Sequence, residues 1–317
     1  MLVCSHKLMF SRLLSVFCLS RAGLAAAVLC LSGCSVKQLA INQVADALAG
    51  TGNVFASDND PQLVREALPF SLKLMESTLS STPDHVGLLT ATSSSFTQYA
   101  YAFIVQDADV LETRDINAAI VMRDRARKLL IRARDYGLRG LEVDHPGITA
   151  ALHADPRKSM AVMKKSDVPL LYWTAAAWGA AISISKSDQA LVGDQIFVEA
   201  LIDRALELDE SYANGAIHAY LIGYESARQG ATTPSEWRIR AHFDRAVELS
   251  GGMQAGPYVS LAEALSIPKQ NRAEFETLLG KALAIDVDAR PQWRLANLIM
   301  QKRARWLLSR KDELFLE

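Results

Sequence analysis

The stretch that decides the fold is PLLYWTAAAWGAAISIS, Pro169–Ser185, which carries no charge. Pro169 suits the first turn of a helix, where its missing backbone N–H is not needed. From Thr174 onward most positions are Ala, Gly or Ser, and side chains this small allow neighbouring helices to approach closely. Tyr172, Trp173 and Trp178 project well beyond them. We therefore predict a central helix at this point of the chain.

Three interpretations of this helix remain open. Its aromatic rings can be ordinary core fillers, as burial statistics favour. They can instead line a void that the small residues leave, as in many ligand pockets. The third interpretation is a membrane span, but crossing a bilayer takes about 20 strongly apolar residues, and this Ala-rich run is shorter.

Outward from this helix, apolar residues recur at spacings of three and four, and no stretch alternates with period two. This pattern predicts an all-α protein. Asp60 before Pro61 predicts a helix start, and Thr82-Pro83-Asp84 is expected to end that helix and cap the next. A last helix is predicted from Pro291 to about Phe315.

Four segments repeat one helix face, with an alanine as the anchor of each. Three residues before each anchor stands a larger apolar residue, and another apolar or small residue stands seven before. These offsets place the side chains on one side of a helix. The pattern predicts stacked antiparallel helix pairs in a degenerate tetratricopeptide-like solenoid. The anchors are Ala133, Ala205, Ala246 and Ala282, and an irregular segment, Gly137–Val168, is expected between the first two.

The N-terminus reads as a targeting segment. Basic residues precede an apolar core, Ala22–Leu31, and the core closes on Leu31-Ser32-Gly33-Cys34. This resembles the bacterial lipobox, in which the cysteine is lipidated before cleavage. We predict a signal peptide over 1–33, a lipidated N-terminus and linker over 34–57, and a helical domain over 58–317. Ser35, in place of the Asp that favours inner-membrane retention, indicates the outer membrane.

The mature chain is nearly balanced in charge. Three of the 34 basic residues lie in the first 33 positions, so 31 remain against 35 acidic ones. This balance does not indicate nucleic acid as a partner. Cys34 would be the one cysteine left after cleavage, so an exported protein would have no disulfide. The basic run Lys302–Lys311 is expected to face solvent.

Catalytic motifs are absent from the sequence. It contains no Gly-rich phosphate loop, no GxSxG elbow and no HExxH, so we expect neither an enzyme nor a cofactor. A hydrolase or metal site using His145, His153 and Asp144 is a weaker alternative. His218 lies in a helix as small and aromatic as the central one, either as a satisfied core histidine or facing a cavity.

Several motifs, in chain order, resemble the T-component lipoproteins of TRAP transporter systems. The resemblance extends from about Val44 to the C-terminus. It implies a lipid-anchored periplasmic protein of tetratricopeptide-like helix pairs, trimeric in some members, with a cavity or pore through each protomer. It also implies the periplasmic solute-binding subunit of a TRAP transporter as partner. The motifs are FTQYAYAF (Phe96–Phe103), LYWTAAAWGAAIS (Leu171–Ser183), DRALELD (Asp203–Asp209), GPYVSLAEAL (Gly256–Leu265) and RLANLIMQKRARWLLSRKDELF (Arg294–Phe315).

Helices that combine small residues with aromatic rings would line such a cavity and bind a ligand without covalent chemistry. The alternative function is a tetratricopeptide lipoprotein scaffold for envelope assembly, without a small-molecule site. We predict that the ligand-binding residues are Gln98, Tyr101, Tyr172, Trp173, Trp178, His218 and Tyr258.

Overall fold

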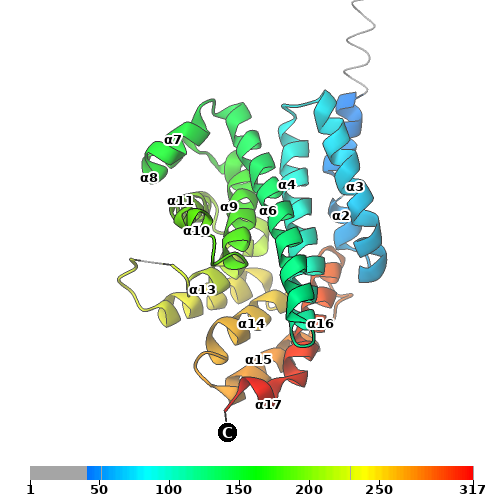
Figure 1. The fold of residues 1–317 in the computed structure, drawn as a ribbon, viewed down its shortest axis with the longest axis vertical. Coiled ribbons are helices and arrows are strands. Elements are labelled where there is room, and N and C mark those ends of the chain that lie inside the picture. The colour runs from blue at the N-terminus through cyan, green and yellow to red at the C-terminus, as the bar shows by residue number, and fades with distance from the viewer. Residues whose placement is uncertain (1–40, 51, 229, 317) are drawn as a thin grey trace, which may run out of the picture.

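A computed structural model describes residues 41–50, 52–228 and 230–316. Every regular element in these ranges is helical, which confirms the predicted all-α fold (Figure 1). The signal peptide and Cys34 lie outside the described residues. The main helices are α2 (Gly52–Ala56), α3 (Pro61–Ser81), α4 (Val86–Ala100), α5 (Gln106–Glu112), α6 (Ile116–Asp144), α9 (Val168–Ser183), α11 (Gln195–Leu208), α12 (Ala216–Tyr224), α13 (Ser235–Ser250), α14 (Ala255–Leu261), α15 (Arg272–Ala284) and α16 (Arg294–Ser309).

The first long helix, α3, begins and ends where the sequence predicts. The Asp60 carboxylate accepts hydrogen bonds from the backbone N–H groups of Gln62 and Leu63, and Thr82 is the C-cap. These carboxylate bonds satisfy N–H groups that have no partner inside the helix. The next helix, α4, is capped differently from the prediction. His85 Nδ1 accepts from the N–H of Leu88, because the imidazole reaches the first turn of α4 from the position directly before it.

The repeated helix face is buried, as its spacing requires. Its anchors lie on α6, α11, α13 and α15, and all four alanines are inaccessible to solvent or nearly so. Leu130, Ile202 and Leu279, three residues before three of these anchors, are fully buried. Each stripe therefore packs inward against a neighbouring helix, as the three-and-four spacing predicts.

The central helix α9 packs against α4, α6, α11 and α12. Its neighbours come close because glycines lie at the crossings. A Cβ built on Gly137 of α6 would lie 2.1 Å from the Thr174 hydroxyl oxygen of α9, and one on Gly140 would lie 2.6 Å from a Leu170 methyl. Glycine at these positions is what allows α6 and α9 to approach this closely.

The last long helix returns to the beginning of the domain. In α16, Leu295 and Ile299 pack against the core cluster that contains Val64 and Leu68 of α3. The Arg294 guanidinium donates to the Ser57 carbonyl at 2.7 Å. The array of helices thus closes on itself, with α16 beside α2, α3 and α14 (Figure 1).

Two further sequence predictions need correction. The segment Gly137–Val168 is not irregular: its first eight residues continue α6 to Asp144, and most of the rest forms short helices. The predicted final helix is broken at Arg310, because the chain turns there and buries Phe315 against Phe275 with ring centroids 5.0 Å apart. The short elements are α7 (Ile148–Ala154), α8 (Pro156–Ser159), α10 (Gln189–Gly193), α17 (Lys311–Leu314) and the 3₁₀ turns η2 (Met160–Val162), η3 (Lys165–Asp167), η4 (Tyr212–Asn214) and η6 (Pro291–Trp293).

Two helices of the array contain a π-helical turn. The first, η1 (Tyr101–Val105), joins α4 to α5, and the second, η5 (Ala262–Ser266), follows α14. A π turn adds a residue to the helical repeat and changes the direction of the side chains that follow. Such turns occur often at functional sites, so they are natural places to look for one here.

Candidate functional site

The aromatic residues at the start of α9 form a cluster with two tyrosines from the following helices. The Tyr172 ring lies 4.9 Å from Trp173, 5.4 Å from Tyr212 and 6.4 Å from Tyr220, measured between centroids. We call these four residues the tyrosine cluster. Burial raises the pKa values of Tyr172 and Tyr220 above the ordinary range, so both phenols stay neutral.

Tyr220 enters this cluster through a gap that a glycine leaves. A Cβ built on Gly179 would lie 2.1 Å from the Tyr220 hydroxyl oxygen. That hydroxyl also donates to the Ala175 carbonyl at 3.4 Å, a long bond. At Gly179, the small residues of α9 are therefore covered by an aromatic ring from α12.

Trp178 has the surroundings of a core residue. Its side chain is 2% exposed, and its indole N–H donates to the Asp194 carboxylate at 3.1 Å. The Phe197 ring lies 5.4 Å away, and the Arg134 guanidinium lies over the indole at 4.9 Å. These contacts cover the ring and satisfy its N–H.

His218 of α12 pairs with a second histidine, His242 of α13. Their Nδ1 atoms lie 2.9 Å apart, so one ring donates and the other accepts. Burial lowers the pKa values of both imidazoles, that of His242 to about 4. Since His218 is 7% exposed, a neutral, hydrogen-bonded pair in the core is the arrangement at neutral pH.

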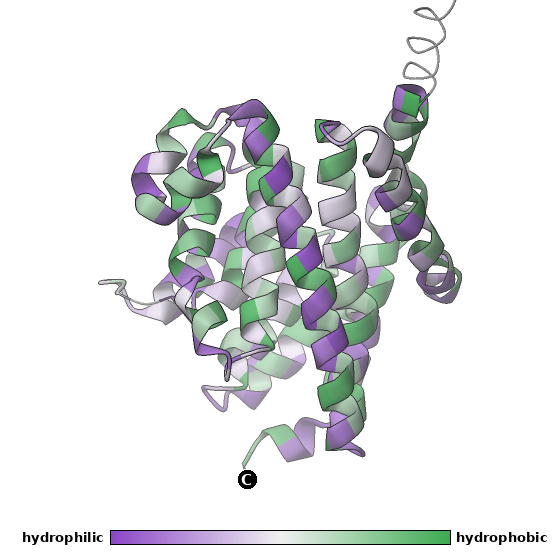
Figure 2. Ribbon diagram, turned by 45° about the horizontal axis from the view of Figure 1, so that its top comes forward, coloured by the Kyte–Doolittle hydropathy of each residue, from purple (hydrophilic) through white to green (hydrophobic). Residues whose placement is uncertain are grey.

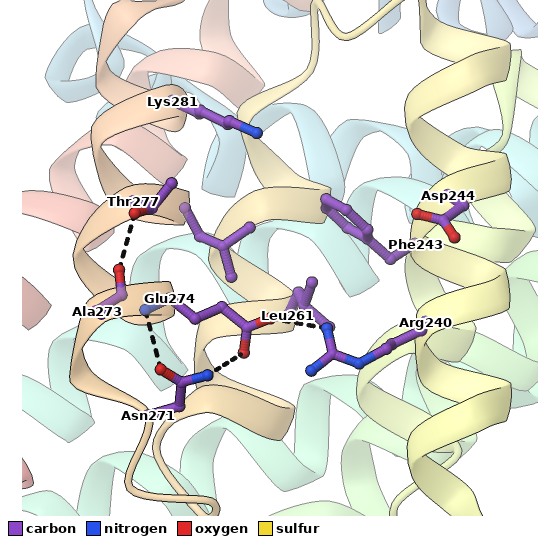
Figure 3. A pocket seen from close by; sticks show the side chains of 10 residues that line it. Arg240, Phe243, Asp244, Leu261, Asn271, Ala273, Glu274, Thr277 and Lys281 are labelled. Atoms are coloured by element: carbon purple, nitrogen blue, oxygen red, sulfur yellow. Dashed lines mark hydrogen bonds and ion pairs between the residues drawn. The ribbon is translucent and has the colours of Figure 1, made fainter.

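Tyr258 of α14 is buried and meets the Phe243 ring edge-on at 5.6 Å. Phe243 in turn lines a pocket of about 450 Å³ between α13 and α15. Figure 3 shows this pocket, with Leu261 of α14 between the two helices and the Arg240–Glu274 ion pair, 2.7 Å long, across one end. Tyr258 thus supports a wall of the pocket and is not part of its lining.

Gln98 and Tyr101 lie one turn apart where α4 becomes the π turn η1, and both are exposed. The Tyr101 side chain keeps 45% of its surface accessible. Even so, burial, with the negative charges of Glu263 and Asp109, raises its pKa to about 12. The negatively charged groups that act on Tyr101 therefore come from α5 and from the second π turn.

Glu263 approaches the same space from the second π turn, η5. The Arg303 guanidinium of α16 donates two hydrogen bonds to Glu263 Oε1, at 3.0 Å from Nε and 2.6 Å from Nη2. Arg303 also lies 3.0 Å from Asp109 Oδ2 of α5. Burial raises the pKa of Glu263 although 28% of its side chain is accessible. We call Tyr101, Glu263, Arg303 and Asp109 the π-turn site.

The two histidines of the alternative hydrolase or metal site contact other residues. His145 Nε2 lies 2.8 Å from Asp167 Oδ2, which also accepts from the backbone N–H of Lys164. The His153 ring packs edge-on against Phe197 at 4.5 Å. In the described part of the chain, no three His, Cys, Asp or Glu side chains are placed to hold a metal ion.

The structure thus distributes the predicted ligand residues over several places. Tyr172 and Trp173 share the tyrosine cluster, Gln98 and Tyr101 share one end of α4, and Trp178, His218 and Tyr258 each lie apart. Ligand binding by all seven stays a prediction. Sequence reasoning did not single out Glu263, although it is the one charged residue between Glu248 and Lys269.

The chain matches a known protein family and a relative over most of its length. A family model described as TRAP transporter T-component matches residues 57–315. The chain belongs to that family. An uncharacterized protein of Treponema pallidum (strain Nichols) is 30% identical over 311 residues, which cover 92% of this chain and 96% of that relative. The resemblance stated from the motifs is confirmed.

Membership makes the protein an accessory component of a TRAP transport system. Figure 2 shows hydrophilic and hydrophobic residues interleaved along the long helices of this T-component. None of the helices in the described ranges combines the length and the apolar character that a membrane crossing requires.

Proposed function

We propose that this T-component is tethered to the membrane by lipid on Cys34, faces the periplasm and binds a small organic ligand at the π-turn site. The solute-binding subunit of the transporter would be its protein partner. Family membership supports the role in transport. The lipobox supports the tether, and Ser35 after the cysteine favours the outer membrane.

One observation carries the ligand site. Tyr101, which is 45% exposed, is the first residue of the π turn η1, and turns of this kind occur often at functional sites. The closure of the helical array by α16 supports this reading, because α16 contributes Arg303 to the same site.

Tyr101→Trp tests the site by adding bulk at its accessible wall. Phe70→Trp is the matched control, because Phe70 is 74% exposed on α3. The full-length chain, purified in detergent from envelopes, would be analysed for small molecules by mass spectrometry and for co-purifying solute-binding subunit. We expect Tyr101→Trp to lose the small molecule without a loss of melting temperature, and Phe70→Trp to retain it.

Two results would argue against the proposal. If wild type and Tyr101→Trp carry the same small molecule in equal amounts, the π-turn site does not hold it. If no variant carries a small molecule while the partner subunit still co-purifies, the T-component acts as a scaffold between proteins. Lipidation is read separately, from the mass of the N-terminal peptide in wild type and Cys34→Ala.

A further inference from the structure

Helix α3 has a second apolar face, which the described residues leave exposed. Its first apolar face, with Val64 and Leu72, is buried in the core. On the other face Leu63 is 56% exposed, Phe70 74% and Leu74 39%. A cluster of large apolar side chains in water is a mark of an interaction surface. Figure 1 shows α3 at the outer edge of the helical array, where a partner can reach it.

The exposed residues have the spacing of a helix–helix contact. Leu63, Ala67, Phe70 and Leu74 are separated by four, three and four residues, and all four are exposed. This alternation is the a/d pattern of a coiled coil, a narrow stripe that fits one partner helix. A helix that lies on a membrane is instead rich in Lys and Arg, whereas α3 contains one of each. We call these four residues the α3 seam.

Two of the four charged residues of α3 flank this seam. The other two face the rest of the fold: Arg65 is paired with an aspartate of α5, and Glu76 accepts a hydrogen bond from a tyrosine of α6. Glu66 and Lys73 lie on the same edge of the seam, seven residues apart, and both are exposed. The Lys73 ammonium contacts Glu76 on its own helix and has further N–H donors. This edge therefore suits a partner helix with an acid and a base in the opposite order.

A second copy of α3, running antiparallel, has that opposite order. In the register that places Phe70 over the second copy's Ala67, a large ring faces a small side chain, and Leu63 meets the second copy's Leu74. The same register brings Glu66 beside the second copy's Lys73. Each of these contacts occurs twice about one two-fold axis, as in an isologous interface. A parallel copy would lack the contact between the acid and the base, because residues of this edge would then face the other edge of the seam.

We propose that two copies of this T-component associate through antiparallel α3 seams, with the Ala67–Phe70 contacts on either side of the two-fold axis. One pair of short helices buries less surface than a standard stable interface, so the pair dissociates on dilution. A lipid tether on both copies raises their effective concentration in the membrane and favours the pair. The inference is independent of the ligand at the π-turn site.

Cysteine cross-linking in cell envelopes tests both the contact and its direction. Leu63→Cys and Leu74→Cys would be introduced singly and together into the full-length chain, which is then oxidised and separated on a non-reducing gel. We expect the double variant alone to shift to twice the mass, because each substituted position faces the other one in the second copy. Ile120→Cys with Trp237→Cys is the matched control, since both residues are exposed and apolar but lie on α6 and α13. It should stay monomeric, as should wild type.

A charge exchange tests the two edge contacts without altering the seam. Glu66→Lys leaves two bases on the edge, and Lys73→Glu leaves two acids, so each variant repels its own copies. Added to the double-cysteine chain, each substitution should remove most of the cross-linked dimer when expressed alone. Co-expressed with different tags, the two chains should cross-link to each other, because every edge contact then joins opposite charges.

Several results would overturn the α3 pair. A dimer from either single-cysteine variant would mean that like positions meet, which the antiparallel register forbids. A monomeric double variant, a control that cross-links equally well, or a ladder that continues to trimers would exclude the two-fold contact. Co-expressed charge variants that cross-link no better than each one alone would exclude the edge contacts. The Tyr101→Trp experiment decides the proposed ligand site separately from all of these.

Discussion

The contact between Gly179 and Tyr220 offers a sharp test of how the central helix is packed. A methyl group added at Gly179 would lie 2.1 Å from the Tyr220 hydroxyl oxygen but 3.3 Å from the ring carbon that carries it. The severe overlap therefore involves the hydroxyl alone. Gly179→Ala should be harmful in the wild-type protein and nearly harmless once Tyr220→Phe has removed that oxygen.

The expected magnitudes follow from two opposing effects. Overpacking a core typically costs about 1–3 kcal/mol, whereas replacing glycine by alanine inside a helix gains roughly 0.5–1 kcal/mol. Gly179→Ala alone should thus lower the free energy of unfolding by about 1–2 kcal/mol. In the Tyr220→Phe background the helix gain remains, and the change should be close to zero or stabilising.

Urea unfolding of the four proteins of this double-mutant cycle, followed by circular dichroism, measures the coupling directly. Gly280→Ala is the control, because Gly280 lies inside α15 with no atom within 4 Å of an added Cβ. It should stabilise the protein by roughly 0.5–1 kcal/mol. If Gly179→Ala costs the same with and without the Tyr220 hydroxyl, the contact does not limit the approach of α12 to α9.

Three further predictions concern single residues. Burial lowers the pKa of His242 to about 4, below its ordinary 6.5. The unfolded chain therefore binds more protons between these values, and stability should fall by about 2 kcal/mol as the pH drops from 7.5 to 4.5. His242→Gln should lack this part of the loss in urea titrations at the two pH values. Asp60→Ala removes the α3 cap and should cost about 1 kcal/mol by urea unfolding, with Asp60→Asn close to wild type; equal losses would contradict a capping role. Trp178→Ala should cost about 3–5 kcal/mol by the same method, and a loss below 1 kcal/mol would show that the ring is not part of the core.

Local chemistry and helical periodicity could be read from the sequence. Asp60 before Pro61 predicted a cap that the structure contains, because that cap depends on a carboxylate and the N–H groups two and three residues later. The anchor Ala205 predicted a buried face, because a spacing of three and four leaves one side of α11 toward its neighbours. Both features are decided within one helix.

Contacts between two helices could not be predicted from the sequence. The small residues of α9 left a void and a filled core both open, and the sequence could not show that Tyr220, from α12, occupies the space over Gly179. Trp178 was predicted to face a cavity, whereas Asp194 and Phe197, which follow it along the chain, enclose it. A gap beside small residues is filled or left open by partners that composition does not identify.

The π-turn site shows the same limit in its electrostatics. Arg303 belongs to a basic run that the sequence assigns to solvent, yet it faces inward because α16 closes the array against α5 and η5. Glu263 stands alone in an apolar segment, where an unpaired carboxylate would be costly. A lone acid in such a segment therefore requires a cation from elsewhere in the fold, and the arginine that supplies it lies 40 residues further along the chain. The isolated charge of Glu263 could be recognised in the sequence. Only the folded helices show that Arg303 pairs with it and that both hydrogen bonds end on one carboxylate oxygen.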